Sequence, residues 1–279
     1  MEEVTGSSPV EPTSNYCKDV IIDSNTLSLV GRPVAAAIKK RLKTDIANLE
    51  VKPKLAIIHI SPDASADIYV HLKQRFGADI DASVEILRPP AGQLEATIAR
   101  LNDDATVHGI IIQLPLPDAL PTQTLLASVE ASKDVDGLAP NSPFITAGAR
   151  GIMELLAAYG VKLSDARVAL VGTGALFGGP LRPCLEKTGA QLEVFDLKRP
   201  IDREIIRSCK IIIGATGEVG IITDKLVSPG AVVVDATGVD VAPEVRQRRD
   251  IRITPASGGV GPMTVAALFE NLVEAAQAK

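Results

Sequence analysis

The sequence contains few aromatic residues, few cysteines and only a small net charge, and each shortage excludes a class of protein. Aromatic side chains make up 3% of the 279 residues and tryptophan is absent, so a surface that stacks nucleic-acid bases is poorly supplied. The formal net charge of −5 gives no overall attraction for DNA or RNA. Any anion that this protein binds must therefore be held by a local site.

Cysteines and long apolar runs are also scarce. Cys17, Cys184 and Cys209 form no close pair, which argues against a disulfide framework or a zinc site and favours a reducing compartment. No apolar run reaches the roughly 18 residues of a membrane span, and the first 15 residues lack the patterns of secretory and transit peptides. We expect a cytoplasmic protein with a disordered tail over residues 1–19, no metal, and neither nucleic acid nor membrane as partner.

Short apolar segments alternate with helical patterns along most of the chain. Several of these segments are continuously apolar, as in strands that are covered on both faces. The expected strands are 55–60, 84–87, 109–113, 167–171, 192–196, 210–214, 231–235 and 251–253. The expected helices between and around them are 34–49, 66–76, 94–101, 151–159 and 180–187. This alternation predicts an α/β fold with mostly parallel sheets and right-handed crossovers.

The segment 134–150 interrupts the alternation with glycine, proline and asparagine, a composition typical of a connection. It predicts a boundary between a first domain over residues 20–143 and a second domain over residues 144–262. The C-terminal segment 263–279 has the pattern of an amphipathic helix. Whether this helix crosses back to the first domain is not decided by the pattern alone.

The second half contains the features of a dinucleotide site. An apolar strand runs into Gly172 and Gly174, which allow a tight turn, and a helix is expected near Pro180 with its first amides facing an anion. The third glycine, Gly178, comes one residue later than usual. Asp196 ends the next strand, where a carboxylate would accept from the ribose hydroxyls and favour NAD over NADP. An ordinary glycine turn remains open, as does a phosphate contact from the neighbouring Lys198.

The first half contains four polar segments with both structural and functional interpretations. Tyr69 and Lys73 are four residues apart, on one helix face, but such a pair is often a packed tyrosine beside a solvated lysine. Gln113 ends a buried strand, at the edge where parallel sheets bind ligands. Asp134 and Asp136 lie in a turn that they could simply stabilise, and the glycine-rich segment 254–264 is either a ligand contact or a tight connection. The three histidines lack metal-ligand spacing.

Four motifs in order resemble one family. Tyr69-Val-x-x-Lys73, Val107-His-Gly-x-x-x-Gln113-Leu-Pro-Leu-Pro117, Lys133-Asp-Val-Asp-Gly-Leu138 and Gly258-Gly-Val-Gly-Pro-Met-Thr264 are similar to those of the bifunctional methylenetetrahydrofolate dehydrogenase/methenyltetrahydrofolate cyclohydrolases. The resemblance covers nearly the whole chain after about residue 21. It implies a folate-binding parallel-sheet domain joined to a Rossmann-like NAD(P)-binding domain, with the active site in the cleft between them. It also implies that the C-terminal helix returns to the first domain and that the protein is a homodimer.

The resemblance also assigns roles to residues. Lys73 would be the general acid/base of hydrolysis, Gln113 would orient it, Tyr69 would stack on the pterin, and Asp136 would accept from the pterin edge. The acid/base role requires a lysine that is partly neutral near pH 7, and therefore a lowered pKa. Further substrate contacts are implied for Leu114, Pro115, Gly258, Gly259 and Pro262. Cofactor contacts are implied for Gly172, Thr173, Gly174, Gly178, Asp196, Lys198, Thr216, Gly217 and Thr264.

Departures from the family pattern lie mostly on the cofactor side. The family's Pro-Cys-Thr-Pro stretch is replaced by Thr146-Ala-Gly-Ala149, and the glycine-loop pair Arg-Ser by Thr173-Gly174. In addition, Ala66, Leu197 and Ser257 replace a serine, a polar residue and a proline. We therefore expect a working folate enzyme that favours NAD over NADP. Two alternatives stay open: only one activity or another reduced pterin carrier, and a dinucleotide-binding sensor without turnover.

Overall fold

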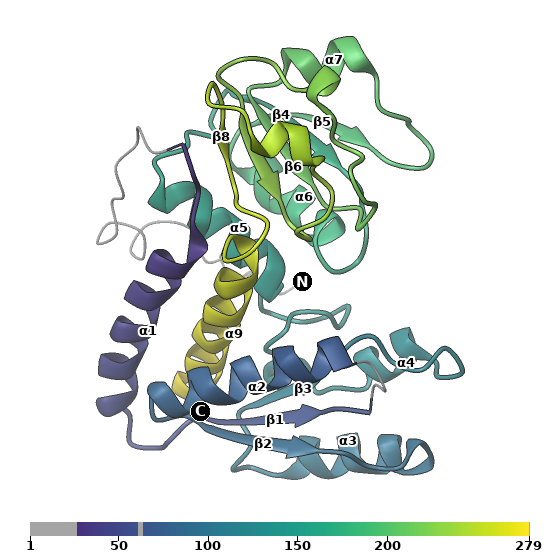
Figure 1. Cartoon of the computed structure of the whole chain (residues 1–279). Helices are drawn as coiled ribbons and strands as arrows, with labels where there is room; N and C mark the ends of the chain where they lie inside the picture. Colours follow the sequence, from purple (N-terminus) through teal and green to yellow (C-terminus); the bar gives the residue numbers. More distant parts are fainter. Residues whose placement is uncertain (1–26, 61–63, 279) are drawn as a thin grey trace, which may run out of the picture.

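The computed structural model describes residues 27–60 and 64–278, which form two α/β parts, each built on a parallel sheet (Figure 1). The expected tail over residues 1–19 lies outside the described residues. Figure 1 shows the N-terminal sheet in the lower half of the view and the C-terminal sheet in the upper half. Helices from both ends and the middle of the chain lie between the two sheets.

The first sheet has the strand order β2-β1-β3, with all pairs parallel. Its strands are β1 (Lys54–Ile58), β2 (Ser83–Leu87) and β3 (Gly109–Ile112). Alternate residues of β1 face opposite sides: Ile57 packs in the cluster that contains α2 (Ala64–Asp79), and Ile58 in the cluster that contains α3 (Leu94–Asp103). Burial on both faces explains why β3, and β1 after Lys54, are apolar throughout, whereas the edge strand β2 carries the exposed Ser83 and Glu85.

The second sheet has the order β5-β4-β6-β7-β8, again entirely parallel. Its strands are β4 (Arg167–Val171), β5 (Gln191–Phe195), β6 (Ile211–Gly214), β7 (Val232–Asp235) and β8 (Arg252–Ile253). The helix α6 (Gly178–Lys187) packs on one face of β4 and α7 (Arg203–Ser208) on the other. The chain reverses direction across the sheet at β4, which is where ligands bind in open α/β sheets.

Three helices join the two sheets. They are α1 (Gly31–Ala47), α5 (Ala147–Ala158) and α9 (Val260–Gln277), and α9 packs along α5, α1 and α2 (Figure 1). Thirteen of the 18 residues of α9 are buried, including Glu270 and Asn271. Because α9 follows the second sheet but contacts α2, which covers the first, it connects the two parts of the molecule.

The expected α/β class with parallel sheets is confirmed, and all eight expected strands are present within one or two residues. Three helices begin more than two residues before the expected start: α1 at Gly31, α5 at Ala147, inside the expected connection, and α9 at Val260. The helix α6 begins at Gly178, within two residues of Pro180. Short helices were missed because four to six residues show too little periodicity to detect. They are α4 (Thr122–Ala127), α7 and α8 (Pro243–Arg246), with the 3₁₀ turns η1 (Ala91–Gln93), η2 (Ala131–Lys133) and η3 (Asp224–Leu226).

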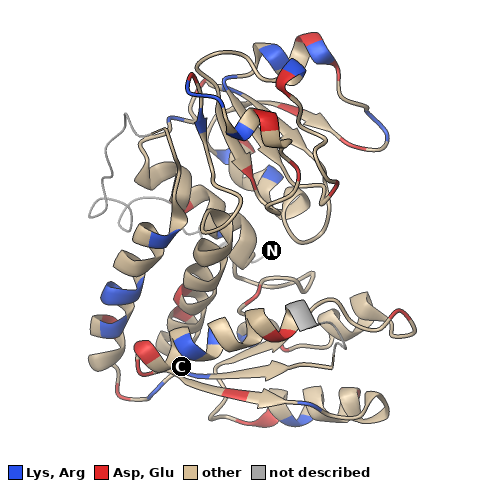
Figure 2. Cartoon of the chain, in the orientation of Figure 1, with Lys and Arg blue, Asp and Glu red and all other residues tan. Residues whose placement is uncertain are grey.

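The charged side chains are spread over both parts of the molecule. In the view of Figure 2, basic and acidic residues alternate around the second sheet, and several basic residues follow α1. Among the described residues, no helix is long and apolar enough to cross a membrane. In that same part of the chain, no group of three or more histidine, cysteine or acidic side chains is placed to hold a metal ion.

Candidate functional site

A buried lysine–glutamine pair lies at the carboxyl edge of the first sheet. Lys73, on the sheet-facing side of α2, donates from Nζ to Oε1 of Gln113 at 2.9 Å. Gln113 directly follows β3, and its Nε2 donates to the carbonyl of Leu114 at 2.8 Å. Both side chains are 8% exposed. The amide is therefore oriented at both ends, and its oxygen points toward the ammonium.

Burial changes the proton affinity of this lysine. The pKa of Lys73 is lowered from its ordinary value because burial disfavours the charged ammonium, although the nearby Asp136 carboxylate acts in the opposite direction. The pKa of Asp136 is raised, also chiefly by burial, with Lys73 as the opposing influence. Each group therefore has a larger neutral fraction at neutral pH than it has in water. Such a lysine can accept a proton as well as donate one.

The turn that carries Asp136 is held by its neighbours. Lys133 inserts its ammonium against the carbonyls of Leu101, Asn102 and Asp104 at 2.6–3.0 Å, where α3 ends. Asp134 is buried and accepts from the amide of Ala139 at 2.7 Å. These two side chains therefore fix the turn on which Asp136 lies.

Asn271 attaches this turn to the C-terminal helix. It is fully buried on α9, and its Nδ2 donates to the carbonyls of Val135 and Ile145, both at 2.9 Å. Sequence analysis missed Asn271, since a polar residue in a mostly apolar helix pattern does not indicate what it contacts. Its only signal was that it interrupts the apolar residues of this helix.

Tyr69 and the segment after Gln113 lie at the rim of the same edge. Tyr69 is 49% exposed, one helical turn before Lys73, so its ring is accessible to a ligand. Leu114 packs partly against the core of the first part, whereas Pro115 is exposed. The structure thus brings Lys73, Gln113 and Asp136 close together. Tyr69 lies one helical turn before Lys73, and Leu114 directly follows Gln113.

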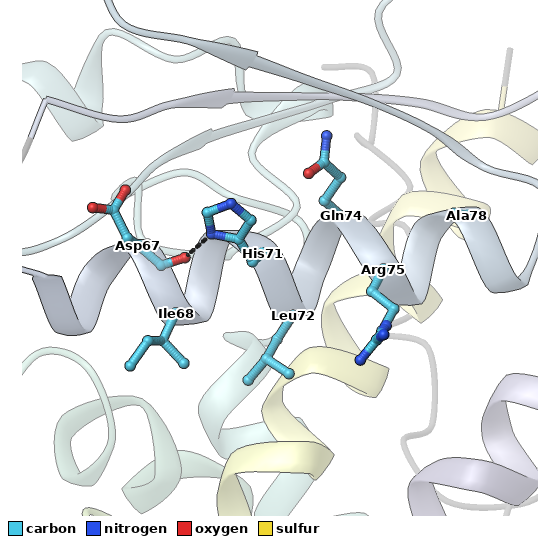
Figure 3. Close-up of a pocket in the computed structure, with 7 residues that line it drawn as sticks. All are labelled: Asp67, Ile68, His71, Leu72, Gln74, Arg75 and Ala78. Atoms are coloured by element: carbon cyan, nitrogen blue, oxygen red, sulfur yellow. Dashed lines mark hydrogen bonds between the residues drawn. The ribbon is translucent and has the colours of Figure 1, made fainter.

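A surface hollow nearby is not this site. Figure 3 shows its lining, which consists of seven residues that all belong to α2: Asp67, Ile68, His71, Leu72, Gln74, Arg75 and Ala78. In the figure His71 folds back so that its Nδ1 lies 2.6 Å from the carbonyl of Asp67, and Ile68 and Leu72 point away from that contact. Neither Lys73 nor Tyr69 contributes to the hollow. A single helix face without convergent groups from other elements is a poor ligand site.

The glycine turn after β4 requires glycine at two positions. Gly172 has φ +97°, and a Cβ there would lie 2.7 Å from the carbonyl oxygen of Ala215. A Cβ on Gly178, the first residue of α6, would lie 1.9 Å from the carbonyl oxygen of Gly172. The third glycine therefore lets α6 start directly against the turn, as the dinucleotide-binding arrangement requires. Thr173 and Gly174 between them are exposed.

Asp196 closes the turn after β5 and faces the glycine turn. Its Oδ1 accepts from the amides of Lys198 at 2.8 Å and Arg199 at 3.0 Å, and its Oδ2 accepts from the Thr173 hydroxyl at 3.4 Å. These backbone contacts hold the pKa of the Asp196 carboxyl below its usual value. The carboxylate therefore both shapes its own turn and presents a second oxygen to the glycine turn.

A buried carboxylate, Asp240, supports the loop after β6. It accepts from the amides of Thr216 and Gly217 at 2.6 and 2.8 Å and also binds the Thr237 hydroxyl. Thr216 and Gly217 are exposed. Because β5 and β6 pair with β4 on opposite sides, the loop after β6 lies on the other side of the glycine turn from Asp196. Sequence analysis missed Asp240. Its loop position after a strand was the only signal.

The glycine-rich segment before α9 lies at the joint between the two parts. The carbonyl of Gly258 accepts from the amides of Gly31 at 2.8 Å and Arg32 at 3.2 Å, at the start of α1. Gly259 is buried and forms the N-terminal cap position of α9, whose first turns contain Pro262 and Thr264. The described contacts of these four residues do not reach the Lys73–Gln113 pair, so their expected ligand roles stay predictions.

The fold and the residues at the carboxyl ends of the two sets of strands define a class of protein. It is a two-part α/β protein with a polar site on one parallel sheet and a dinucleotide-binding arrangement on the other. Comparison with known proteins specifies the family. Residues 29–136 match the model for the tetrahydrofolate dehydrogenase/cyclohydrolase catalytic domain, and residues 146–279 match that of the corresponding NAD(P)-binding domain. The chain belongs to the tetrahydrofolate dehydrogenase/cyclohydrolase family.

Individual relatives agree over nearly their whole length. The bifunctional protein FolD of Heliobacterium modesticaldum is 34% identical over 269 residues, which cover 87% of this chain and 93% of that protein. The crystal structure of the bifunctional FolD enzyme from Campylobacter jejuni matches with a TM-score of 0.84 and 30% identity, covering 90% and 98%. The Trypanosoma brucei enzyme, solved with NADP and an inhibitor, matches with a TM-score of 0.85 and 29% identity, covering 91% and 98%. The family resemblance stated from the sequence is thereby confirmed.

Proposed function

We propose that this protein oxidises methylenetetrahydrofolate to methenyltetrahydrofolate with NAD(P)⁺ and hydrolyses the methenyl compound to formyltetrahydrofolate. The main support is the buried Lys73–Gln113 pair beside Asp136, in a chain that belongs to this family. The relatives are bifunctional FolD proteins, and this chain spans almost their whole length.

In the hydrolytic step Lys73 is the proposed acid/base. Its neutral amine would take a proton from the water that attacks the methenyl carbon, and its ammonium would return a proton to the ring nitrogen as the ring opens. The hydrogen bond to Gln113 leaves the lone pair of the amine directed away from the amide. Tyr69 would stack on the pterin, and Asp136 would accept from its amino-pyrimidinone edge, which offers two parallel donors.

Further folate contacts are proposed at the surrounding loops and at the joint. Leu114 and Pro115 would line the substrate next to Gln113, and Gly258, Gly259 and Pro262 would approach it from the start of α9. We place the folate between the two parts of the molecule. The corresponding division of the chain is a first domain over residues 20–143 with the helix 263–279, and a second domain over residues 144–262.

The carboxyl edge of the second sheet fits a dinucleotide. Gly172 and Gly178 let the turn pack directly against the start of α6, and Gly174 between them has open space around it, so that the backbone can approach a pyrophosphate. When bound, the nicotinamide would accept the hydride from the one-carbon unit. The proposed contacts to the cofactor are Gly172, Thr173, Gly174, Gly178, Asp196, Lys198, Thr216, Gly217 and Thr264.

We propose that NAD is favoured over NADP. The Asp196 carboxylate is an anion at neutral pH, because its lowered pKa keeps it ionised, and its Oδ2 lies on the side of the glycine turn. An anion there accepts from ribose hydroxyls and repels a 2′-phosphate. We further propose a cytoplasmic location, because the cysteine usage favours a reducing compartment, and a homodimer, because the family resemblance implies one.

Replacement of Lys73 tests the hydrolytic role. We expect Lys73→Met to lower hydrolysis of methenyltetrahydrofolate at least 100-fold, the usual contribution of a positioned acid/base, while the protein still binds NAD. The loss of the methenyl absorbance measures the rate. Undiminished hydrolysis would exclude Lys73 as the acid/base.

Parallel assays with the two cofactors test the cofactor preference. Purified protein with methylenetetrahydrofolate should reduce NAD with a higher kcat/KM than NADP, followed by absorbance of the reduced nicotinamide. Reduction of NADP alone would contradict the interpretation of Asp196 while leaving the folate activity intact.

A second candidate is an enzyme that has kept only the hydrolysis. It is favoured by the buried start of α5, where the Thr146 hydroxyl accepts from the Ala149 amide at 3.3 Å and Ala147 and Ala149 are fully buried. This segment therefore offers few exposed polar groups to a cofactor. Hydrolysis of methenyltetrahydrofolate without reduction of either cofactor would select this candidate.

A further inference from the structure

The side chain of Arg199 folds back onto β5, the strand that precedes it in the chain. Its Nη2 donates to Oε2 of Glu193 at 2.8 Å, and its Nη1 donates to the carbonyl of Val194 at 3.3 Å. Its Cζ lies 5.2 Å from the centre of the Phe195 ring, a cation–π distance. The guanidinium therefore has three contacts, and all of them lie on β5.

The backbone of Arg199 nevertheless lies beside the Asp196 carboxylate. Its amide donates to Oδ1 of Asp196 at 3.0 Å, and its carbonyl accepts from the Asp196 amide at 2.9 Å. The backbone of Arg199 therefore lies next to the carboxylate that we propose for the ribose, while its guanidinium is bound to Glu193. The partners of the guanidinium on β5 thus set the direction of the side chain.

Glu193 is well suited to hold the guanidinium. Its two oxygens bind two arginines, Arg199 at 2.8 Å and Arg167 of the neighbouring strand at 3.2 Å. The hydrogen bond from Arg199 lowers the pKa of the Glu193 carboxyl, so the residue is an anion at neutral pH. Glu193 and Phe195 lie on the same face of β5, since side chains two residues apart in a strand point the same way.

We propose that Glu193 is a specificity-determining residue for the dinucleotide, because it keeps Arg199 away from the 2′ position of the adenosine ribose. Arg199 is the guanidinium nearest in the chain to Asp196, and a guanidinium is the preferred partner of a phosphate. With Arg199 held on β5, its guanidinium does not compensate the charge of the Asp196 carboxylate at the proposed ribose position. This inference rests on the proposed preference for NAD, and it assigns that preference to two residues instead of one.

The competing interpretation is an ordinary surface ion pair. Exposed pairs of this kind contribute only about 0–1 kcal/mol to stability, and in that case breaking the pair would leave cofactor recognition unchanged. The two interpretations differ in what the freed arginine does. They are separated by measuring the affinity for a ligand with a 2′-phosphate.

The test is a double-mutant cycle read by binding and not by turnover. The full-length protein and the variants Glu193→Gln, Arg199→Ala and Glu193→Gln/Arg199→Ala are titrated calorimetrically with ADP-ribose and with 2′-phospho-ADP-ribose. Glutamine keeps the size of the side chain and removes its charge, and the melting temperature of each variant reports its folding.

We expect Glu193→Gln to raise the affinity for 2′-phospho-ADP-ribose, relative to ADP-ribose, about tenfold, the effect of one charge-assisted hydrogen bond. In the double variant this gain should disappear. Arg199→Ala alone should leave the ratio of affinities unchanged, because the guanidinium already lies away from the ribose.

Two results would overturn the inference: no gain in Glu193→Gln, or a gain that persists in the double variant. A wild-type protein that prefers the 2′-phospho ligand would instead contradict the proposed preference for NAD, while the variants still report on Glu193. If neither ligand binds the wild-type protein, both the dinucleotide site and this inference are wrong.

Discussion

At the scale of single residues, the proposed hydrolysis depends on the buried Lys73 and on the nearby Asp136 carboxylate. Burial lowers the pKa of Lys73, whereas Asp136 raises it again, and burial is the larger influence. Gln113 adds a neutral hydrogen-bond acceptor and no charge. The proton affinity of Lys73 is therefore set by a balance that a single substitution at Asp136 should shift.

The first prediction concerns Asp136→Asn. Removing the carboxylate removes the influence that raises the pKa of Lys73, so this pKa should fall further. Hydrolysis that needs the neutral amine should then begin at lower pH. We expect the acidic limb of the pH profile of kcat for hydrolysis to move to lower pH, measured at saturating methenyltetrahydrofolate.

Asp118→Asn is the matched control, because Asp118 lies on an exposed turn beyond Gln113. Its pH profile should coincide with that of the wild type. An acidic limb that moves to higher pH in Asp136→Asn would show that the carboxylate does not act on Lys73 in this way.

At the scale of elements, the turn that carries Asp136 and the glycine turn after β4 are each held in place by close contact with a helix end. Lys133 fills the end of α3 with its ammonium, and the turn with Asp136 follows immediately. At the other edge, α6 begins in van der Waals contact with the backbone of Gly172. In both places a helix end packs directly against a turn for which we propose ligand contacts.

The second prediction concerns Lys133→Met. Methionine fills most of the space but removes the donor to the carbonyls of Leu101, Asn102 and Asp104, of which the Leu101 contact is fully buried. We expect the free energy of unfolding to fall by about 2 kcal/mol, measured by urea denaturation, and the KM for the folate to rise. Lys39→Met, which removes an exposed ion pair with Asp79, should change stability by about 1 kcal/mol or less.

The third prediction concerns Gly178→Ala. A Cβ at this position would lie 1.9 Å from the backbone oxygen of Gly172, so either the turn or α6 must move. We expect NAD binding to fall at least tenfold, as a misplaced pyrophosphate site implies, measured by calorimetry. Gly189→Ala tests the turn after α6, where φ is +78° and no atom lies near the added Cβ; it should lower stability without lowering the affinity for NAD. Unchanged NAD binding in Gly178→Ala would contradict the proposed cofactor position.

At the scale of the whole molecule, a buried charge cluster holds together the three helices that join the sheets. Arg150 on α5 contacts Glu154 at 3.0 Å, Glu270 at 3.3 Å and Glu274 at 2.8 Å, and Arg41 on α1 also binds Glu270. Three carboxyls thus share two guanidiniums. Burial, together with the neighbouring Glu270, raises the pKa of Glu154 to about 8, so one carboxyl of the cluster keeps its proton near neutral pH.

The fourth prediction follows from this pKa. The folded protein holds the Glu154 proton up to about pH 8, whereas an unfolded glutamate loses it near its model value of 4.5. Between these values the folded state binds more protons, so stability should decrease as the pH rises. We expect Glu154→Gln to be more stable relative to the wild type at pH 8.5 than at pH 6, measured by denaturant unfolding.

Glu186→Gln provides the control for this measurement, because Glu186 forms an exposed pair with Arg182 on α6. Its stability relative to the wild type should show no such trend between the two pH values. A difference for Glu154→Gln that is independent of pH would contradict a retained proton in the cluster.

The sequence by itself determined the strands, the α/β class and the family. Continuous apolar segments bounded by glycine and proline leave a buried parallel strand as the natural conformation, and four motifs in order specify the family. It also located Lys73, Gln113 and Asp136, since these types recur in the motifs. Local patterns carry this information within a few residues.

Only the tertiary structure decided how these residues act on one another. The link from Asn271 to Val135 spans 136 positions of the chain, and Arg41 meets Glu270 across 229. Neither contact leaves a periodic signal, because each depends on how α1, α5 and α9 pack. The lowered pKa of Lys73 and the raised pKa of Glu154 arise in the same way, since burial is a property of the assembled fold and not of the neighbouring sequence.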